Sequence, residues 1–480
     1  MTPSSATQAA IATSRFGFGA RPGELGSVAS DPRGWLLAQL GREYRAPPEL
    51  GDLVPGAAVL AQFQAARERQ NRAREQAAKE AAAGSDPVRQ LFENVREQLL
   101  PHYQAQAAAR TRLALTSSDT FRERLTQFWS NHFAVSIDKP ICLGTAGAFE
   151  NEAIRPHVCG RFEELLLAVE THPAMITYLD NQQSAGPDSE LAVLARRRRP
   201  LAARAPAART GLNENLAREI LELHTLGVDG GYTQADVTTF AAVLTGWSIG
   251  GGPGRYASGE PGTFQFREAL HQPGARTILG RRYAEAGLRQ GTAVLADLAS
   301  HPATARHLAT KLARHFVADE PPPALVTRLA AAYRASGGDL PKVYEALVTW
   351  EGAWQPAQLK FKTPVEFGYS ALRALDVVPK EPKMLLAPFE VLGQRHWSPG
   401  SPAGWPDRAQ DWDGANALMK RIEWSVALAG RVGDSHSAIG AADATLATLA
   451  GAHTREALGR ASSGSQALVL LLMSPEFQRR

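Results

Sequence analysis

The sequence predicts a mainly α-helical fold with one small β-hairpin insertion, and two observations carry that prediction. Apolar residues recur at spacings of three and four along most of the chain, which is the period of an amphipathic helix rather than of a strand. Only one short stretch shows the alternation of a strand pair. With 480 residues, 44% of them hydrophobic and 21% charged, the composition is that of an ordinary globular protein. We expect one large helical domain over residues 1–480.

Start and stop signals support several of the predicted helices. Thr233 and Asp236 have the spacing of a capping box, and Gly230 and Gly231 ahead of them supply the positive φ angles of a turn. Residues 65–83 mix charges of both signs with little apolar content beyond alanine, which predicts an exposed helix without a coiled-coil stripe. The predicted helices span residues 58–83, 87–115, 119–135, 161–170, 212–226, 233–246, 284–299, 303–317, 323–336 and 340–350.

Two stretches interrupt the helical pattern. Residues 184–211 are rich in Arg, Ala, Pro and Gly, which predicts a mobile basic loop rather than a domain boundary. The arginine run 196–199 inside it is either a phosphate contact or a solvated loop, and because no aromatic residues are interleaved, nucleic-acid binding is not expected. The β-hairpin insertion is expected over residues 250–282, where 264–266 can pair with 277–279 across a turn.

The composition also excludes several classes of protein. Two cysteines, Cys142 and Cys159, rule out a disulfide-dense scaffold and a cysteine zinc module, and they fit either free thiols or one bridge. No apolar run reaches 18 residues, so no membrane-spanning helix is expected. The first residues lack the basic and apolar regions of a secretory signal, which predicts a cytoplasmic protein. A formal net charge of +4 says little about partners.

The densest cluster of polar residues lies between residues 213 and 224. On a helix, Asn215, Glu219 and Glu222 fall on one face, and two carboxylates one turn apart can bind a divalent metal or act as general acid and base. An exposed ladder of ion pairs, in which Arg218 lies between Glu214 and Glu222, explains the same spacing equally well.

Two histidines extend this candidate site. His132 ends an apolar stripe, with apolar residues three, four and seven positions before it. A buried imidazole needs a hydrogen-bond partner or a ligand, so His132 is either a satisfied core residue or a functional one. His224 follows Glu219 by five residues, and the two side chains can meet only where the helix bends.

A set of short motifs is spread over the chain: Phe16–Gly23, Phe128–Phe133, His172–Met175, Tyr178–Asn181, Gly211–Asn215, Ala217–Glu219, Leu221–Gly231, Leu244–Trp247, Lys362–Pro364 and Gly404–Pro406. Taken together, these motifs resemble one bacterial family, the domain-of-unknown-function family numbered 1800. The resemblance runs from about residue 10 to the C-terminus. One position departs from the family pattern, because Ser130 stands where a histidine is more common.

The resemblance directs attention to particular residues. Its motif residues are mostly His, Asp, Glu and Asn, which are types needed for proton transfer or coordination. We expect an enzyme with a polar, helix-lined cleft that holds a divalent metal, a hydrolase or an oxidoreductase acting on a small molecule or a glycan. His172 and His271 lie close to prolines and serve equally well as helix-end or turn residues. The predicted catalytic residues are Glu219, His132 and Asp180; the predicted metal ligands are Glu219, His224 and His132; the predicted rim residues are His172, Asn213, Glu214 and His271.

The resemblance also implies an alternative function. Genes of this family often neighbour those of a second family, which resembles sulfatases and alkaline phosphatases and whose members commonly carry twin-arginine export signals. The alternative is therefore a non-catalytic binding or assembly partner of a sulfatase-like protein. The exposed helix 65–83 and the basic residues 196–209 would supply the contact surfaces. Co-export to the periplasm with that partner follows from this alternative.

Overall fold

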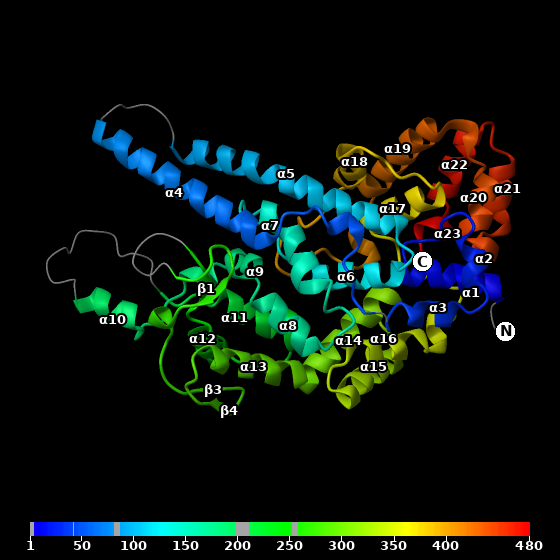
Figure 1. The fold of residues 1–480 in the computed structure, drawn as a ribbon. Coiled ribbons are helices and arrows are strands. Elements are labelled where there is room, and N and C mark those ends of the chain that lie inside the picture. Colours follow the sequence, from blue (N-terminus) through cyan, green and yellow to red (C-terminus); the bar gives the residue numbers. More distant parts are fainter. Residues whose placement is uncertain (1–3, 42, 81–86, 198–210, 252–257) are drawn as a thin grey trace.

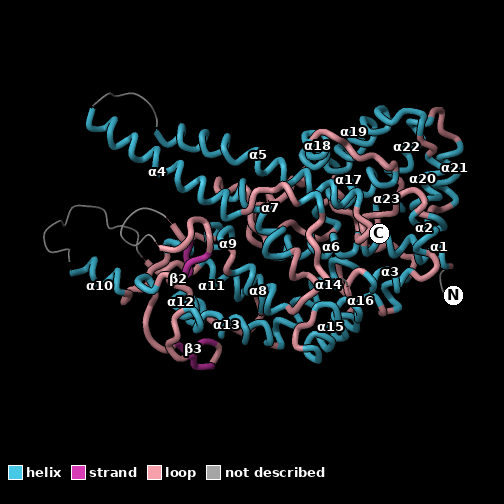
Figure 2. Tube along the Cα trace, viewed as in Figure 1, coloured by secondary structure: helices cyan, strands magenta, loops and turns pink. Residues whose placement is uncertain are grey.

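The computed structural model describes residues 4–41, 43–80, 87–197, 211–251 and 258–480. Over these residues the chain is mainly α-helical with two small antiparallel two-stranded sheets, which confirms the predicted fold class. Two helices, α4 (Gly56–Glu80) and α5 (Pro87–Thr116), extend beyond the rest of the molecule at the upper left of Figure 1. Both pack against α7 (Cys142–Phe149). Figure 2 shows that the strands gather at one end of the molecule, away from both chain ends.

The larger of two hydrophobic clusters, here called the main core, is built mostly from helices between the N-terminal helix and α16, and Trp354, Leu386 and Trp397 also belong to it. The elements that contribute to it, besides α4, α5 and α7, are α1 (Ser5–Ile11), α2 (Glu24–Val28), α3 (Pro32–Ala38), α6 (Thr120–His132), α8 (Phe162–Glu170), α9 (Pro173–Tyr178), α11 (Asn215–Glu219), α12 (Gln234–Val243), α13 (Leu288–Ser300), α14 (Pro302–Phe316), α15 (Pro323–Ser336) and α16 (Leu340–Val348). Three π-helical segments continue helices within it: η1 (Ala12–Phe16), η3 (Glu150–Ile154) and η5 (Ile220–Thr225).

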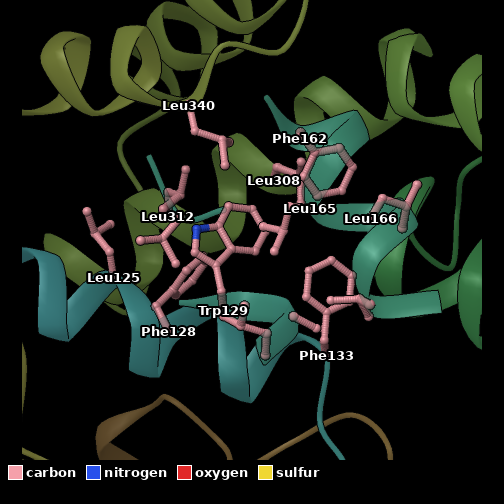
Figure 3. Packing of buried hydrophobic residues seen from close by; sticks show 14 of the residues in the cluster. Leu125, Phe128, Trp129, Phe133, Phe162, Leu165, Leu166, Leu308, Leu312 and Leu340 are labelled. Carbon is pink, nitrogen blue, oxygen red and sulfur yellow. The ribbon is translucent and has the colours of Figure 1, made fainter. Parts of the chain in front are cut away.

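Trp129 of α6 lies at the centre of the main core (Figure 3). Its ring is packed among apolar side chains that include Phe162 and Leu308, and it is fully buried. Its Nε1 donates a hydrogen bond of 2.6 Å to the hydroxyl of Tyr344, so the indole N–H is satisfied without water. The predicted apolar stripe that ends at His132 is therefore confirmed as a buried face of α6.

The second hydrophobic cluster, here called the C-terminal core, packs α17 and α18 against α5. Its first helix begins at a capping box: the Thr363 amide donates to Glu366 Oε2 at 3.0 Å, and the Glu366 amide donates to Thr363 Oγ1 at 3.3 Å. The helices of this part are α17 (Pro364–Ala374), α18 (Pro382–Leu392), α19 (Ala415–Val432), α20 (Ala438–Thr445), α21 (Ala452–Gly459), α22 (Gly464–Met473) and α23 (Pro475–Gln478).

Short 3₁₀ turns connect many of these helices. They are η2 (Pro48–Leu50), η4 (Asn181–Gln183), η6 (Glu268–Leu270), η7 (Glu351–Trp354), η8 (Ala409–Asp411), η9 (Gly433–Ser435) and η10 (Ala447–Leu449).

The strands pair differently from the sequence prediction. They are β1 (Trp247–Ile249), β2 (Phe264–Phe266), β3 (Arg276–Ile278) and β4 (Arg281–Tyr283), and the pairs are β1 with β2 and β3 with β4. The predicted pairing of 264–266 with 277–279 is therefore wrong. Leu279 and Gly280 both have positive φ angles, 50° and 76°, as a two-residue type I′ turn requires. This turn closes β3 onto β4, and β2 pairs with the strand that precedes it.

The predicted basic loop over residues 184–211 contains a helix, α10 (Glu190–Arg197). Residues 198–210, with the second half of the arginine run, lie outside the described residues. The predicted charged helix over 65–83 is described as part of α4 up to Glu80, and residues 81–83 likewise lie outside the described part.

Two exclusions drawn from the composition can be compared with the structure. Cys142 and Cys159 are both free thiols, so the second alternative, one bridge, does not hold. Across the described ranges, no helix combines the length and the apolar character that crossing a membrane requires.

Candidate functional site

The polar residues predicted between 213 and 224 lie on a helix that changes type in its middle. The α-helical turns of α11 end at Glu219, and the chain continues as the π-helical segment η5. Hydrogen bonds in a π-helix span five residues, which suits contact between residues five apart. Burial raises the pKa of Glu219, and His224 lies close enough to counteract that effect. The helix type therefore changes between Glu219 and His224, and His224 is near enough to act on the Glu219 carboxyl.

His132 and His224 are both buried, and the backbone joins them. His132 Nε2 donates to the carbonyl oxygen of His224 at 3.1 Å, while His224 Nδ1 lies 2.7 Å from Glu170 Oε1. One residue earlier, the carbonyl of Leu223 accepts from His307 Nε2 at 3.1 Å. Carbonyl groups at the end of a helix have no partner within it. The end of η5 therefore ties α6 and α14 together through two histidines.

The contacts of these side chains bear on the predicted metal centre. Among the described residues, no group of three His, Cys, Asp or Glu side chains could hold a metal ion. His224 Nδ1 is hydrogen-bonded to the Glu170 carboxylate and His132 Nε2 to a backbone carbonyl, so one nitrogen of each ring already has a protein partner. The metal set of Glu219, His224 and His132 has no geometric support and stays a prediction.

Three further predicted residues, Asp180, Asn213 and Glu214, line a separate open cavity of about 670 Å³. Their polar groups are engaged within the protein. Asp180 Oδ2 lies 2.7 Å from Lys139 Nζ, and Asn213 Nδ2 donates to a backbone carbonyl at 2.9 Å. Glu214 pairs with Arg218 at 3.0 Å, which is the first half of the predicted ion-pair ladder. The Asp180 carboxylate is thus held by Lys139 and by Gln183, which donates to its Oδ1 at 3.1 Å, and its catalytic role stays a prediction.

The two remaining predicted residues, His172 and His271, hold local structure. His172 is the N-cap of α9: its Nδ1 accepts from the Ala174 amide at 3.1 Å, and its Nε2 lies 3.0 Å from Glu152 Oε2. His271 Nδ1 donates to the carbonyl oxygen of Thr245 at 2.9 Å. The alternative interpretation, that these histidines serve helix ends and turns, accounts for these contacts.

A different set of polar residues meets in a cavity of about 340 Å³, here called the central cavity. Its walls come from α6, α14, the start of α17 and the segment 394–411, so it lies where the main core meets the C-terminal core. The volume is within the usual range of small-molecule pockets. Four of the sequence motifs contribute to its lining, through residues that include Phe18, Asn131, Thr363 and Trp405. The structure thus brings together motifs that are more than 200 residues apart in the sequence.

Asn131 holds one wall of the central cavity in place. Its Nδ2 donates to the carbonyl oxygen of Trp405 at 2.9 Å, and its Oδ1 accepts from the Trp405 amide at 2.7 Å. Gly404, just before, has a φ of 84°, and a Cβ there would lie 2.3 Å from the Asn131 carbonyl oxygen. Only glycine allows this approach. The Gly404–Pro406 motif is therefore explained by a close backbone contact.

A buried charge cluster lies against the same cavity. Arg480 binds both oxygens of Glu366, with Nη2–Oε1 at 2.9 Å and Nε–Oε2 at 3.1 Å, and Arg124 pairs with Oε1 as well. Burial would raise the pKa of Glu366, but the two arginines and His315 hold it far below its usual value. Glu366 therefore stays ionised, and its negative charge is paired with the two arginines.

His315 of α14 and Asp407 form a pair on the cavity wall. His315 Nδ1 lies 3.1 Å from Asp407 Oδ2, and the other carboxylate oxygen lies 3.3 Å from Lys360 Nζ. Burial lowers the pKa of His315 to about 4 and outweighs the attraction of Asp407, so the ring is neutral at neutral pH. A neutral ring that donates from Nδ1 carries its lone pair on Nε2. That Nε2 has no hydrogen-bond partner among the described residues.

Lys311 lies one helical turn before His315 on the same face of α14. The side chain is half-buried and lines the cavity, and within the described part of the chain its amine makes no hydrogen bond or ion pair. Burial and the nearby Arg314 lower the pKa of Lys311 to about 8, although Asp407 opposes them. The amine is therefore mostly protonated at neutral pH.

Sequence reasoning found His132 of this site and missed most of the others. His307, Lys311 and His315 follow one another at intervals of four within a predicted helix, which is the one sequence signal that could have indicated a polar face on α14. Asp407 and Glu366 show no such pattern.

Fold and site together define a mainly α-helical protein with a polar cavity between two hydrophobic cores. The family model described as "Protein of unknown function (DUF1800)" matches residues 11–479. The chain therefore belongs to this family, which confirms the resemblance inferred from the motifs. No curated protein and no solved structure matches the chain.

Proposed function

We propose that the chain is an enzyme that hydrolyses a small-molecule ester in the central cavity, with His315 as the group that transfers protons. The observation that supports this proposal is the arrangement of His315, which lines the cavity. Its Nδ1 lies 3.1 Å from Asp407 Oδ2, and its buried Nε2 has no hydrogen-bond partner among the described residues. In serine hydrolases a carboxylate in this position orients the histidine and selects its tautomer.

The proposed role of His315 is to activate water. Its Nε2 takes a proton from a water molecule that attacks the ester, and it returns the proton to the leaving oxygen when the ester bond breaks. Asp407 stabilises the imidazolium that exists between the two transfers. His132 lines the same cavity and has an unpartnered Nδ1, so it is a candidate to hold the substrate or the water.

The test is an assay of the purified chain against p-nitrophenyl carboxylic, phosphate and sulfate esters. We expect turnover of one ester class, and a fall in kcat of about 100-fold or more in His315→Gln. Asp407→Asn keeps the shape of the side chain but removes its charge, so it should lose a large part of the same activity. His453→Gln, which alters an exposed histidine outside the cavity, is the matched control and should leave kcat unchanged.

The proposal is rejected if no ester class is turned over by the folded protein. It is also rejected if His315→Gln, with a native circular dichroism spectrum, keeps the kcat of the unaltered chain.

The alternative from the family resemblance, assembly with a sulfatase-like protein, remains a second hypothesis. The exposed face of α4 supports it, since Arg72 is 76% exposed and its ion-pair partner Glu68 lies on the same helix. Co-purification at low salt tests this alternative, and the absence of a complex between the two folded proteins would remove it. Co-export to the periplasm depends on the same assembly.

A further inference from the structure

We infer that the substrate of the central cavity carries an oxyanion, a carboxylate, phosphate or sulfate group, and that Lys311 and Arg314 bind it. The juxtaposition behind this inference is two cations without a carboxylate partner on one helix, directly beside His315. The inference deepens the proposed function, because it names the substrate class of the same cavity, and it rests on that proposal.

The other cations of the cavity wall are already paired with carboxylates. Each has an acidic partner within 4 Å, and most of those partners lie outside the cavity. The pairs are Arg124 with Glu366, Arg110 with Glu150 at 3.0 Å, Arg395 with Asp138 at 3.6 Å and Arg408 with Glu320 at 3.4 Å.

Lys311 and Arg314 differ from these cations. Arg314 Nε donates to the backbone carbonyl of Asp319 at 3.1 Å, but no described carboxylate pairs with its guanidinium or with the Lys311 amine. Both side chains are only partly exposed. A charge removed from water without a counter-ion lowers stability. A bound anion supplies that counter-ion. The Lys311 ammonium would contribute a compact positive charge, and the planar Arg314 guanidinium would contribute hydrogen-bond donors.

The carboxylates on the wall do not fill this role. Glu366 is held by two arginines, and Asp407 is held by His315 and Lys360. The third carboxylate, Asp411, is exposed to solvent. Asp407 raises the pKa of Lys311, but it lies beyond ion-pair distance of the amine, so no carboxylate of the wall contacts Lys311 or Arg314. Both cations can therefore pair with a molecule that enters the cavity.

The anion would lie within reach of the proposed chemistry. Side chains one helical turn apart have Cβ atoms about 5–6 Å from each other, and Lys311 and His315 both line the cavity from the same face of α14. Its negative charge would also raise the pKa of the His315 imidazole, because an opposite charge favours the protonated form. Binding of the substrate thus moves His315 toward the range in which it can both take and return a proton.

Sulfate is the probe for the first experiment, because it keeps its charge at and above neutral pH. Binding is followed by tryptophan fluorescence at constant ionic strength, since Trp397 and Trp405 line the cavity. We expect saturable binding by the unaltered chain and an affinity about tenfold or more weaker in Lys311→Met. The control Lys383→Met removes an exposed lysine on α18 and should leave the affinity unchanged.

The dependence on pH gives a second readout. Sulfate affinity should fall as the pH rises through about 8, where Lys311 loses its proton. In Lys311→Arg the guanidinium keeps its positive charge above pH 8, so this variant should still bind sulfate there. Parallel titrations with phosphate and acetate decide which of the three oxyanions the cavity prefers.

Lys311→Met removes a charge that has no partner among the described residues, so the variant should fold; its thermal midpoint verifies this. The inference is overturned if sulfate affinity is equal in Lys311→Met and the unaltered chain, or if Lys383→Met weakens it as much. His315→Gln separates the two proposals, because it should lose turnover and keep sulfate binding. Sulfate binding with turnover that survives His315→Gln rejects only the proposed function. Turnover that requires His315, without any anion binding, rejects only the present inference.

Discussion

Glu366→Gln is the sharpest test of the charge cluster beside the central cavity. The substitution keeps the shape of the side chain and removes its charge. The Glu366 side chain is 7% exposed, and those of Arg124 and Arg480 are 2% and 1% exposed. The variant would therefore leave two buried guanidinium groups without their common counter-ion.

The expected loss of stability follows from that burial. Removing one partner of a buried ion pair costs about 3–5 kcal/mol. Unfolding entropy is about 2.1 cal/mol/K per residue, so a chain of 480 residues loses about 1 °C of thermal midpoint per kcal/mol. The thermal midpoint of Glu366→Gln should thus fall by about 3–5 °C at neutral pH.

The assay is a thermal scan by circular dichroism at one fixed scan rate. Glu345→Gln is the matched control, because Glu345 forms an exposed pair with Lys342 at 2.9 Å and its loss should leave the midpoint nearly unchanged. Equal midpoints for Glu366→Gln and Glu345→Gln would refute the reasoning, since Arg124 and Arg480 would then be compensated by other groups.

The loss of stability in Glu366→Gln should depend on pH. The pKa of Glu366 is far below its usual 4.5 in the folded protein, so its stabilisation is complete above pH 4.5 and is lost as the pH falls toward the folded value. The difference in midpoint between the unaltered chain and Glu366→Gln should therefore be constant near neutral pH and shrink below about 4.5. A difference that grows in acid would contradict the assigned direction.

Two further predictions concern a backbone contact and the thiols. Gly404→Ala places a Cβ 2.3 Å from the Asn131 carbonyl oxygen at a φ of 84°, so we expect a lower thermal midpoint and altered tryptophan fluorescence; an unchanged spectrum would show that this wall can shift freely. Burial raises the pKa of Cys142 to about 12 and that of Cys159 to about 11, so a thiol reagent at mildly alkaline pH should modify both slowly in the folded protein and rapidly after denaturation. Fast modification of buried Cys142 in the folded state would contradict the assigned burial.

The helices could be predicted from the sequence because their information is local. The segment 303–317 is an example: the structure begins α14 at Pro302 and ends it at Phe316, as apolar periodicity and the proline suggest. The hairpin could not be predicted in the same way. The type I′ turn needs a positive φ at both Leu279 and Gly280. Glycine is typical of such a position, but leucine rarely adopts it, so only one of the two turn residues was recognisable in the sequence.

The candidate site shows the same limit at longer range. His132 was found because its position on an apolar stripe is a local pattern, and that stripe is buried as expected. Asp407 was missed because it comes from a segment without periodicity, and only the tertiary fold brings it to His315, 92 residues away in the sequence. The Lys362–Pro364 and Gly404–Pro406 motifs were recognised as patterns, but their common position on one cavity is a property of the packed molecule.

The position of the central cavity between two separately packed cores has a consequence for how its selectivity can change. One wall, on α6 and α14, is anchored by dense apolar packing around Trp129, where small displacements are opposed steeply. The facing wall, on α17 and the segment 394–411, meets it through polar contacts such as Arg124 with Glu366 and His315 with Asp407. Ionic attraction varies gently with distance, so these contacts survive small sliding movements. Substitutions inside the C-terminal core can therefore reshape the cavity from a distance, without any change to His315 and Asp407, the residues for which we propose a catalytic role.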